Sequence, residues 1–243
     1  MQYETKKRSI LKAISWRTWA TITTAVIVFI FTGEFALAIT VGLFEVIAKM
    51  GLYFFHERLW QKMRFGKKEV PSFVLWFTGL PCSGKKEVAD KVYQELLKDH
   101  LKVERLDSND VRPLFPETGF APEEVNLHVK RAGHLCAMLE KNGVIVVASF
   151  VSPYAQSRNF ARSVANNFVE VYMKSTVEAC EKRDEKGHYA KARRGDYQHF
   201  PGVDAAYDVP EQAEITVDVD HVSTEDAVKQ ITDYLRKNFL KNS

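Results

Sequence analysis

The sequence has little cysteine, and its cysteines are not paired. Only three occur in 243 residues, at Cys82, Cys136 and Cys180, and none stands at metal-ligand spacing from another. This scarcity argues against a disulfide framework and against a structural zinc site. The three residues fit free thiols in a reducing compartment.

A basic excess is lacking beyond the first 70 residues. Residues 1–70 contain 11 Lys and Arg against 5 Asp and Glu, whereas residues 71–243 contain 23 against 26. The formal net charge of +3 therefore comes from the N-terminal segment. The charge distribution gives no indication of a nucleic-acid partner.

Residues 18–33 lack any charged side chain, and a second apolar stretch, residues 35–55, is interrupted only by Glu45 and Lys49. A membrane-spanning helix needs about 20 mostly apolar residues, so the second stretch is long enough and the first slightly short. No persuasive small-residue cleavage site separates them, which disfavours a secretory signal peptide. The pattern predicts an α-helical transmembrane hairpin over residues 1–66, followed by a charged linker at 67–71.

The connecting turn at residues 33–35 lacks positive charge, whereas both flanks of the hairpin are basic. The positive-inside rule then predicts a multi-pass protein of the cytoplasmic membrane, with both ends cytoplasmic. Glu45 and Lys49, four residues apart, can neutralise each other on one helical face, although a polar contact in an oligomer or a small pathway would also use them. The basic flanks are Lys6, Lys7, Arg8, Lys12 and Arg17 before the hairpin and Arg58, Lys62, Arg64, Lys67 and Lys68 after it, and the expected interfacial anchors are Trp16, Trp19, Tyr53 and Trp60.

The hairpin carries two short motifs, KAISWR at residues 12–17 and HERLW at residues 56–60. Over roughly residues 6–65 it resembles a small family of two-helix membrane proteins of unknown function (DUF2061). The resemblance implies an anchor or sensor and no chemistry.

From residue 72 onward, apolar runs alternate with helical stretches, which is typical of a parallel sheet wrapped by helices. The sequence therefore predicts an α/β domain over residues 72–243. Strands are expected at residues 73–77, 103–106, 144–149, 168–173 and 215–219, and helices at 85–100, 123–142, 155–166, 177–184 and 225–238.

The first of these strands runs into a glycine-flanked loop, Gly79-Leu80-Pro81-Cys82-Ser83-Gly84-Lys85, and a helical pattern follows. Glycines let backbone N–H groups turn inward, the helix N-terminus adds a positive dipole, and the lysine adds a point charge. An ordinary strand–turn–helix corner is the plain alternative. The flanking context favours a phosphate-binding P-loop.

The position after Lys85 lacks the hydroxyl that a P-loop uses as a Mg²⁺ ligand. It is occupied by Lys86, whose ammonium cannot ligate a metal and would repel one. This change is compatible with phosphate binding but disfavours metal-assisted phosphoryl transfer.

Polar residues follow the later strands, where ligands gather in such sheets. Asp107, Asp110 and Arg112 could orient a hydroxyl and clamp a phosphate, or form a solvated turn with an N-cap aspartate. The cationic residues 183–195 suit either a lid over a triphosphate or a solvated surface helix. Phe200 lies in a tight turn, where it could stack on a base or simply pack.

Together these blocks resemble the adenylylsulfate kinase (APS kinase) family, whose P-loop enzymes transfer the γ-phosphate of ATP to the 3′-hydroxyl of adenylyl sulfate. The resemblance spans about residues 72–236. Its blocks, in family order, are GLxxSGK at 79–85, LDxxxVR at 106–112, GFxPE at 119–123, SFVSPY at 149–154, CEKRDxKGxYxKAR at 180–193 and FxGVDxxYxxPE at 200–211.

The resemblance implies a P-loop kinase fold and assigns the site residues. It places Asp107 and Lys85 at the reacting centre. It implies ATP contacts from Gly79, Leu80, Pro81, Cys82, Ser83, Gly84, Lys85, Lys86, Arg183, Lys186 and Arg193. It implies acceptor contacts from Arg112, Phe120, Arg131, Ser149 and Phe200, with the two phenylalanines enclosing the acceptor base.

The sequence departs from this family around one pocket. The family's LDGDNVR reads LDSNDVR here, so Ser108 replaces a glycine and Asn109 an aspartate. Together with Lys86, these changes remove two usual contributors to Mg²⁺ binding and hydroxyl activation. Asp110, one residue further on, could compensate only if the loop is reshaped.

Further departures lie on the acceptor side of the same pocket. Val125 and His128 stand where the family has an arginine and an asparagine that contact the acceptor, and Ala155 stands where it has an arginine. The nucleotide-binding blocks are kept, while the metal and acceptor contacts are altered.

Two functions fit these features. The first is a membrane-anchored ATP-dependent kinase of sulfate assimilation that phosphorylates adenylyl sulfate or a related nucleotide-linked acceptor, with Mg²⁺ bound weakly. The alternative is a catalytically degraded nucleotide-binding module that signals to or regulates the hairpin. The expected partners are ATP, the acceptor and the lipid bilayer, with no nucleic acid, and a homodimer is the assembly that we keep open. A structural protein without ligands is disfavoured, because the intact loop would then be idle.

Overall fold

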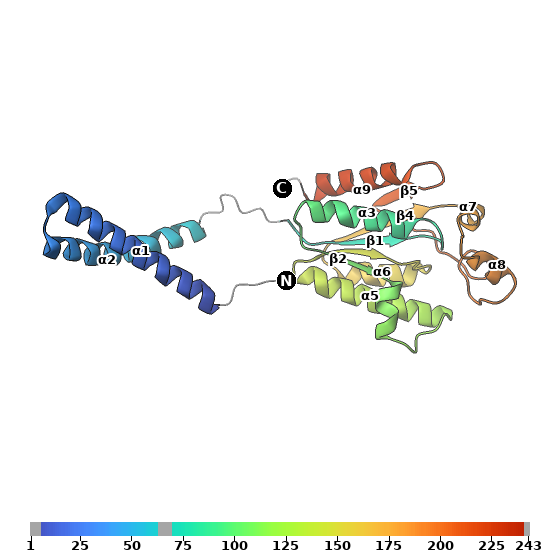
Figure 1. The fold of residues 1–243 in the computed structure, drawn as a ribbon. Helices are drawn as coiled ribbons and strands as arrows, with labels where there is room; N and C mark the ends of the chain where they lie inside the picture. The colour runs from blue at the N-terminus through green and yellow to red at the C-terminus, as the bar shows by residue number, and fades with distance from the viewer. Residues whose placement is uncertain (1–5, 63–69, 241–243) are drawn as a thin grey trace. The chain divides into compact units, whose positions relative to one another are not determined.

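The computed structural model describes residues 6–62 and 70–240, and the chain divides into two compact units, Met1–Lys67 and Lys68–Ser243. The first unit contains helices α1 (Lys6–Thr32) and α2 (Phe35–Lys62), joined at Gly33, whose φ of 71° is accessible to glycine without strain (Figure 1). Among the described helices, the segment Phe35–Phe55 of α2 is long and apolar enough to cross a membrane, and the apolar part of α1, Arg17–Thr32, is shorter.

Close packing of small residues joins α1 and α2. A Cβ added at Gly42 would lie 3.6 Å from Thr21 Cγ2 and 3.8 Å from Ala25 Cβ, which is ordinary contact distance. Glu45 and Lys49 form the intrahelical ion pair that their spacing predicts. Part of the predicted flank falls outside the described residues or side chains, namely Lys6, Lys7, Arg8, Lys12, Trp16, Trp60, Lys62, Arg64 and residues 67–69 of the linker.

Within residues 70–240, five parallel strands form one sheet in the order β2-β3-β1-β4-β5. The strands are β1 (Val74–Thr78), β2 (Val103–Asp107), β3 (Ile145–Ser149), β4 (Phe168–Lys174) and β5 (Ile215–Asp218). This sheet confirms the predicted α/β fold, and each expected strand agrees with the structure to within about one residue at either end. The two central strands β1 and β3 form because their apolar runs are buried on both faces, with all five residues of each buried.

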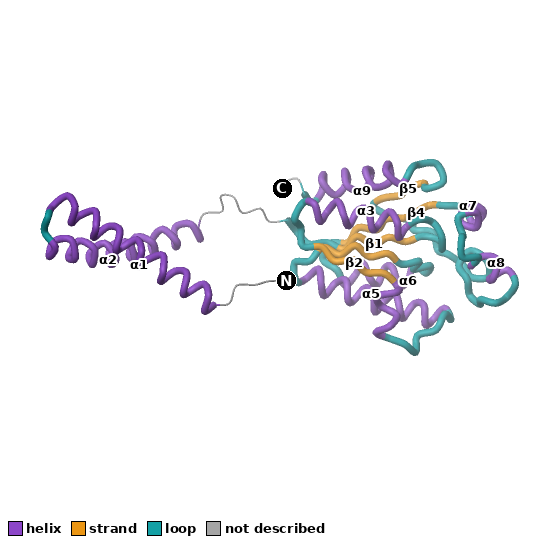
Figure 2. Tube along the Cα trace, in the orientation of Figure 1, coloured by secondary structure: helices purple, strands orange, loops and turns teal. Residues whose placement is uncertain are grey.

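Helices cover both faces of this sheet (Figure 2). Leu75 and Phe77 of β1 enter a core with α3 and α9, whereas Val74 and Trp76 enter a second core with α5 and α6. This alternation follows from the two-residue period of a strand. The covering helices are α3 (Lys85–Lys98), α5 (Pro122–Lys141), α6 (Ala155–Val164) and α9 (Thr224–Asn238).

The carboxyl edge of the sheet carries short elements, of which α7 and α8 lie beyond the strand ends in Figure 1. These elements are α4 (Ser108–Val111), the 3₁₀ turn η1 (Arg112–Leu114), α7 (Val177–Lys182) and α8 (His188–Arg193). The helix expected at 177–184 ends at Lys182, and the one expected at 155–166 ends at Val164 because Ala165 is extended, with ψ of 151°. Both ends stop two residues early.

Candidate active site

The loop between β1 and α3 is held tightly by its backbone. Gly79 has φ of 157°, and a Cβ there would lie 2.8 Å from Met173 O and 2.9 Å from Ser83 Oγ. Only glycine fits this position. Gly84 caps α3 with φ of 75°, and the first N–H groups of the helix, which have no partner within the helix, lie at this end of it.

Lys85 is the buried cation of this loop. Its side chain is 9% exposed and its ammonium donates to Leu80 O at 2.8 Å. Burial lowers the pKa of Lys85 to about 8, because no carboxylate offsets the lost hydration. Ser83 Oγ is fully buried and has no hydrogen-bond partner within the described structure. The loop therefore holds a cation and an unsatisfied hydroxyl, both suited to a phosphate oxygen.

The same loop is tied to the α7–α8 region. The Tyr189 hydroxyl donates to Pro81 O at 3.0 Å, and Cys82 Sγ donates to Asp184 Oδ1 at 3.6 Å. Burial and the neighbouring Asp184 raise the pKa of the Cys82 thiol to about 11. The motif did not reveal these contacts, since Tyr189 and Asp184 lie about 100 residues further along the chain.

The register of the sheet brings the predicted reacting residues to one edge. Ser149, the buried last residue of β3, is paired with Phe77 of β1 on one side and with Asp107 of β2 on the other. One strand, β3, therefore lies between the P-loop strand and Asp107. Two strand spacings place them about 10 Å apart. The sequence predicted that these residues lie at the carboxyl edge of the sheet, and the strand pairing shows which of them are neighbours.

Asp107 is fully engaged in this structure. It caps α4, with Oδ1 accepting from Asn109 N–H at 2.7 Å, and Oδ2 lies 2.8 Å from Lys86 Nζ. Desolvation favours the neutral acid, but hydrogen bonds from Lys86 and the Asn109 N–H outweigh it and lower the pKa of Asp107. The N-cap aspartate and the candidate reacting carboxylate are thus the same residue.

Asp110 does not take over the role of the aspartate replaced by Asn109. Its Oδ2 accepts from the Asp107 N–H at 2.8 Å and closes a capping box around the start of α4. Asn109 is exposed, and its backbone N–H, not its side-chain carboxamide, donates to Asp107.

Arg112, Arg131 and the Phe120 ring form the next layer of the site. Arg112 lies over the Phe120 ring at 4.0 Å and donates to Thr118 O at 3.0 Å. Arg131 donates to Thr118 Oγ1 at 2.9 Å. Phe120 is 64% exposed, so one face of this predicted acceptor contact is open to a ligand.

Ser108 and His128, both departures from the family pattern, contact each other. Ser108 Oγ lies 3.3 Å from His128 Nε2, and the other ring nitrogen of His128 has no partner within the described structure. Burial, followed by the charges of Arg112 and Arg131, lowers the pKa of His128 to about 4. The imidazole is therefore neutral near pH 7. Both positions were identified from the sequence as departures from the family, but no sequence pattern indicated that they contact each other.

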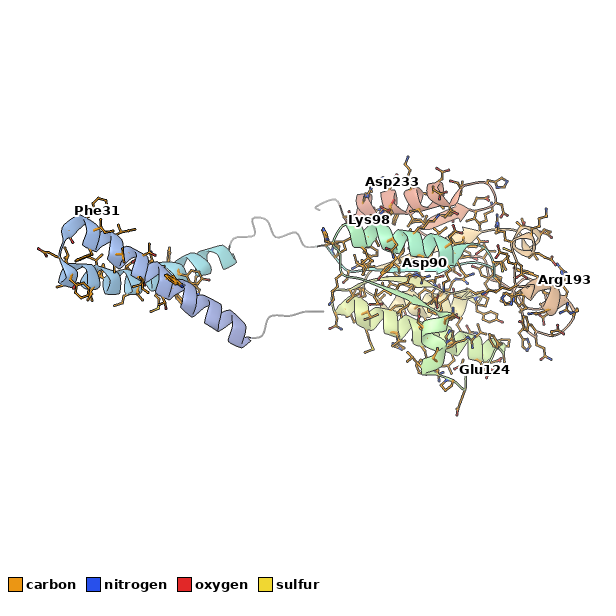
Figure 3. The ribbon with its side chains drawn as sticks, in the orientation of Figure 1. Phe31, Asp90, Lys98, Glu124, Arg193 and Asp233 are labelled. Atoms are coloured by element: carbon orange, nitrogen blue, oxygen red, sulfur yellow. The ribbon has the colours of Figure 1, made fainter. Side chains whose placement is uncertain are left out.

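Some of the cations in residues 183–195 are already paired with carboxylates. Arg183 pairs with Asp220 at 2.9 Å and Arg193 with Glu181 at 2.9 Å, whereas Lys186 is exposed. Figure 3 shows Arg193 on α8, at the end of the domain beyond the strands. Phe200 packs edge-on against the buried Tyr189, with ring centroids 5.0 Å apart.

The side chains near Asp107 do not fit as ligands of the Mg²⁺ ion that the P-loop kinase fold implies. Both oxygens of Asp107 and one of Asp110 already accept hydrogen bonds from protein groups. One of these groups is the Lys86 ammonium, which would repel a metal ion. Within residues 6–62 and 70–240, no group of three His, Cys, Asp or Glu side chains is placed to hold a metal.

Comparisons with known proteins match both parts of the chain. Residues 71–218 match the family model described as adenylylsulphate kinase, and residues 10–61 match the model described as predicted membrane protein (DUF2061). An adenylyl-sulfate kinase of Staphylococcus epidermidis is 40% identical over 73% of this chain and 91% of its own length. One of Thermodesulfovibrio yellowstonii is 41% identical over 68% of this chain and 84% of its own.

A solved structure agrees with these matches. The Mycobacterium tuberculosis APS kinase CysC, determined in complex with AMPPNP and APS, aligns with a TM-score of 0.66 and 32% identity. The alignment covers 69% of this chain and 99% of that one.

Proposed function

The chain belongs to the adenylylsulphate kinase family, and we propose that it is a membrane-anchored kinase that transfers the γ-phosphate of ATP to the 3′-hydroxyl of adenylyl sulfate or of a related nucleotide-linked acceptor. The observation that carries the proposal is the strand register that sets Phe77, Ser149 and Asp107 side by side. It supports a phosphate donor on the loop after β1 and an acceptor hydroxyl beside Asp107.

The proposed roles follow from the contacts of each group. Lys85 and the N–H groups at the start of α3 hold the phosphates. Arg112 and Arg131 face the acceptor, and the open face of Phe120 stacks on its base. The acceptor hydroxyl bonds to the γ-phosphorus, the bond to the bridging oxygen breaks, ADP leaves, and the hydroxyl proton passes to the Asp107 carboxylate. Lys86 must move away from Asp107 before that carboxylate can accept a proton.

Turnover by the intact protein tests this proposal. The full chain in detergent, given ATP and adenylyl sulfate, should form ADP and the 3′-phosphorylated product, and Asp107→Asn should lose at least about a hundredfold in rate if the carboxylate accepts the proton. Binding of ATP without product from any of a panel of nucleotide acceptors would contradict the kinase.

A second candidate is favoured by the ion pair between Lys86 and Asp107, whose Nζ and Oδ2 are 2.8 Å apart. In this alternative the domain binds a nucleotide without turnover and reports its occupancy to the hairpin. The neutralised carboxylate is the observation in its favour. Nucleotide-dependent protection of α1 and α2 in hydrogen exchange, with no ADP formed, would support it.

Membrane anchoring rests on the hairpin. Large apolar side chains of α1 and α2 are exposed, including Phe31 at 86% and Phe44 at 73%, which a lipid bilayer would cover. With the flanking charges, we propose two spans in the cytoplasmic membrane and a kinase domain on the cytoplasmic side. Fractionation of the full chain with membranes that resist a carbonate wash would support the anchor, and recovery in the soluble fraction would refute it.

A further inference from the structure

Lys86 is the first residue of the site whose chemistry differs from that of a metal-dependent kinase. Its ammonium lies 2.8 Å from Asp107 Oδ2, and its side chain is 61% exposed, against 12% for Asp107. Since it lies in the first turn of α3, this cation stands beside the phosphate loop on a side chain long enough to swing. A cation at this place opposes a divalent metal and attracts a phosphate.

The loop offers positive charge from three sources. Lys85 is buried, Lys86 is exposed in the first turn of α3, and the N–H groups of that turn add the positive end of the helix dipole. Lys86 adds one positive charge to that of Lys85, at the place where a metal-dependent P-loop holds Mg²⁺. Ser83 Oγ, fully buried and without a partner in the described structure, independently indicates a ligand in the loop.

Among the residues that the structure describes, no group of three His, Cys, Asp or Glu side chains competes with this arrangement for a cation. The carboxylates of Asp107 and Asp110 already accept from Lys86 and from backbone N–H groups, and the amide of Asn109 is on the surface. A divalent cation binding to Asp107 Oδ2 would have to displace the Lys86 ammonium.

We propose that this loop binds nucleoside triphosphate without a divalent metal, with Lys86 as the countercharge. ATP entry draws Lys86 from Asp107 to the phosphates, so that one lysine alternates between the two sites. This inference rests on the proposed function, since it takes ATP as the ligand of the loop. It goes further in naming metal-free ATP as the species bound.

The direct test compares ATP binding by the full-length protein in detergent, by titration calorimetry in excess EDTA and in saturating MgCl₂. We expect the dissociation constant in EDTA to equal that in MgCl₂ within about threefold, or to be lower. A tenfold or greater gain of affinity with Mg²⁺ would overturn the inference while leaving the proposed kinase intact. Absence of ATP binding in both solutions would overturn both.

Variants at Lys86 assign the effect. Lys86→Met removes the charge without adding a ligand, so ATP affinity in EDTA should fall about ten- to a hundredfold, as for loss of one charge-assisted contact. Lys86→Thr restores a hydroxyl, and together with Asn109→Asp it should create a dependence on Mg²⁺. Unchanged affinity of Lys86→Met in EDTA would refute the role of Lys86.

Lys98→Met is the matched control. Lys98 lies in the last turn of the same helix, pairs with Glu95 at 2.6 Å, and is labelled at the far end of α3 in Figure 3. Removing this charge should leave ATP affinity unchanged in both solutions. Because the wild-type comparison needs no substitution, the inference stays testable even if a variant does not fold.

Discussion

At the scale of single residues, the environment of Lys85 leads to the clearest prediction about ATP binding. Within the described residues its buried ammonium donates to a loop carbonyl alone, so a phosphate oxygen would be a stronger partner. Lys85→Ala should weaken ATP binding by about 1.5–3 kcal/mol, or about ten- to a hundredfold. Calorimetric titration of both proteins with ATP checks this, and equal dissociation constants would show that the loop is not a phosphate site.

The pKa of Lys85 also predicts a pH dependence. In the free protein this pKa is lowered to about 8, so the side chain is charged below pH 8 and progressively neutral above it. A bound phosphate favours the charged form and raises the pKa, so binding takes up protons above pH 8. ATP affinity should be flat from pH 6.5 to 7.5 and fall by up to about tenfold per pH unit above 8.

Calorimetry at pH 8.5 in two buffers of different ionisation enthalpy measures this proton uptake directly. Wild type should take up a fraction of a proton, and Lys85→Met should take up less. If the two proteins take up equal amounts, the titrating group is not Lys85.

At the scale of elements, the contact between α5 and α6 leaves no room for a side chain at Gly133. A Cβ there would lie 2.8 Å from Ala161 Cβ and 2.9 Å from Ala161 Cα. Gly133→Ala should therefore cost about 1–3 kcal/mol of stability through overpacking, despite the better helix propensity of alanine. Urea unfolding of the intact chain, followed by circular dichroism, would measure the shift.

Met138→Ala, on the same helix, is the control for that experiment. Met138 is 63% exposed, so its truncation should change the midpoint little. Gly133→Ala with the midpoint of wild type would mean that α6 can move away from α5 without loss.

The elements themselves were largely predictable from the sequence. Buried strands such as β1 carry continuous apolar runs, and glycines mark the phosphate loop, so local pattern sufficed. The pairings of Lys86 with Asp107 and of Ser108 with His128 were not predictable. Each pair joins residues about 20 apart whose meeting depends on how α3 and α5 pack on the sheet. Local patterns identify such residues but do not identify their partners.

At the scale of the whole molecule, the charges flanking the hairpin predict its topology. Tags at the two ends of the chain should both resist protease in right-side-out vesicles and both be cut after the vesicles are opened. A tag placed in the turn at residues 33–35 is the positive control and should be cut from outside. Cleavage of either terminal tag in sealed vesicles would contradict the two-span hairpin.

Strand β3 also sets a distance in the proposed site. Because Ser149 is paired with Phe77 on one side and with Asp107 on the other, the spacing of the sheet fixes the distance between the proposed donor loop and the proposed acceptor carboxylate. That gap is set by backbone hydrogen bonds, so side-chain changes in the surrounding loops leave it in place. In the proposed kinase, loops could thus be exchanged for ones that select another acceptor without changing this distance. If the domain is the proposed kinase, its substrate preference and its transfer distance are therefore traits that can change separately.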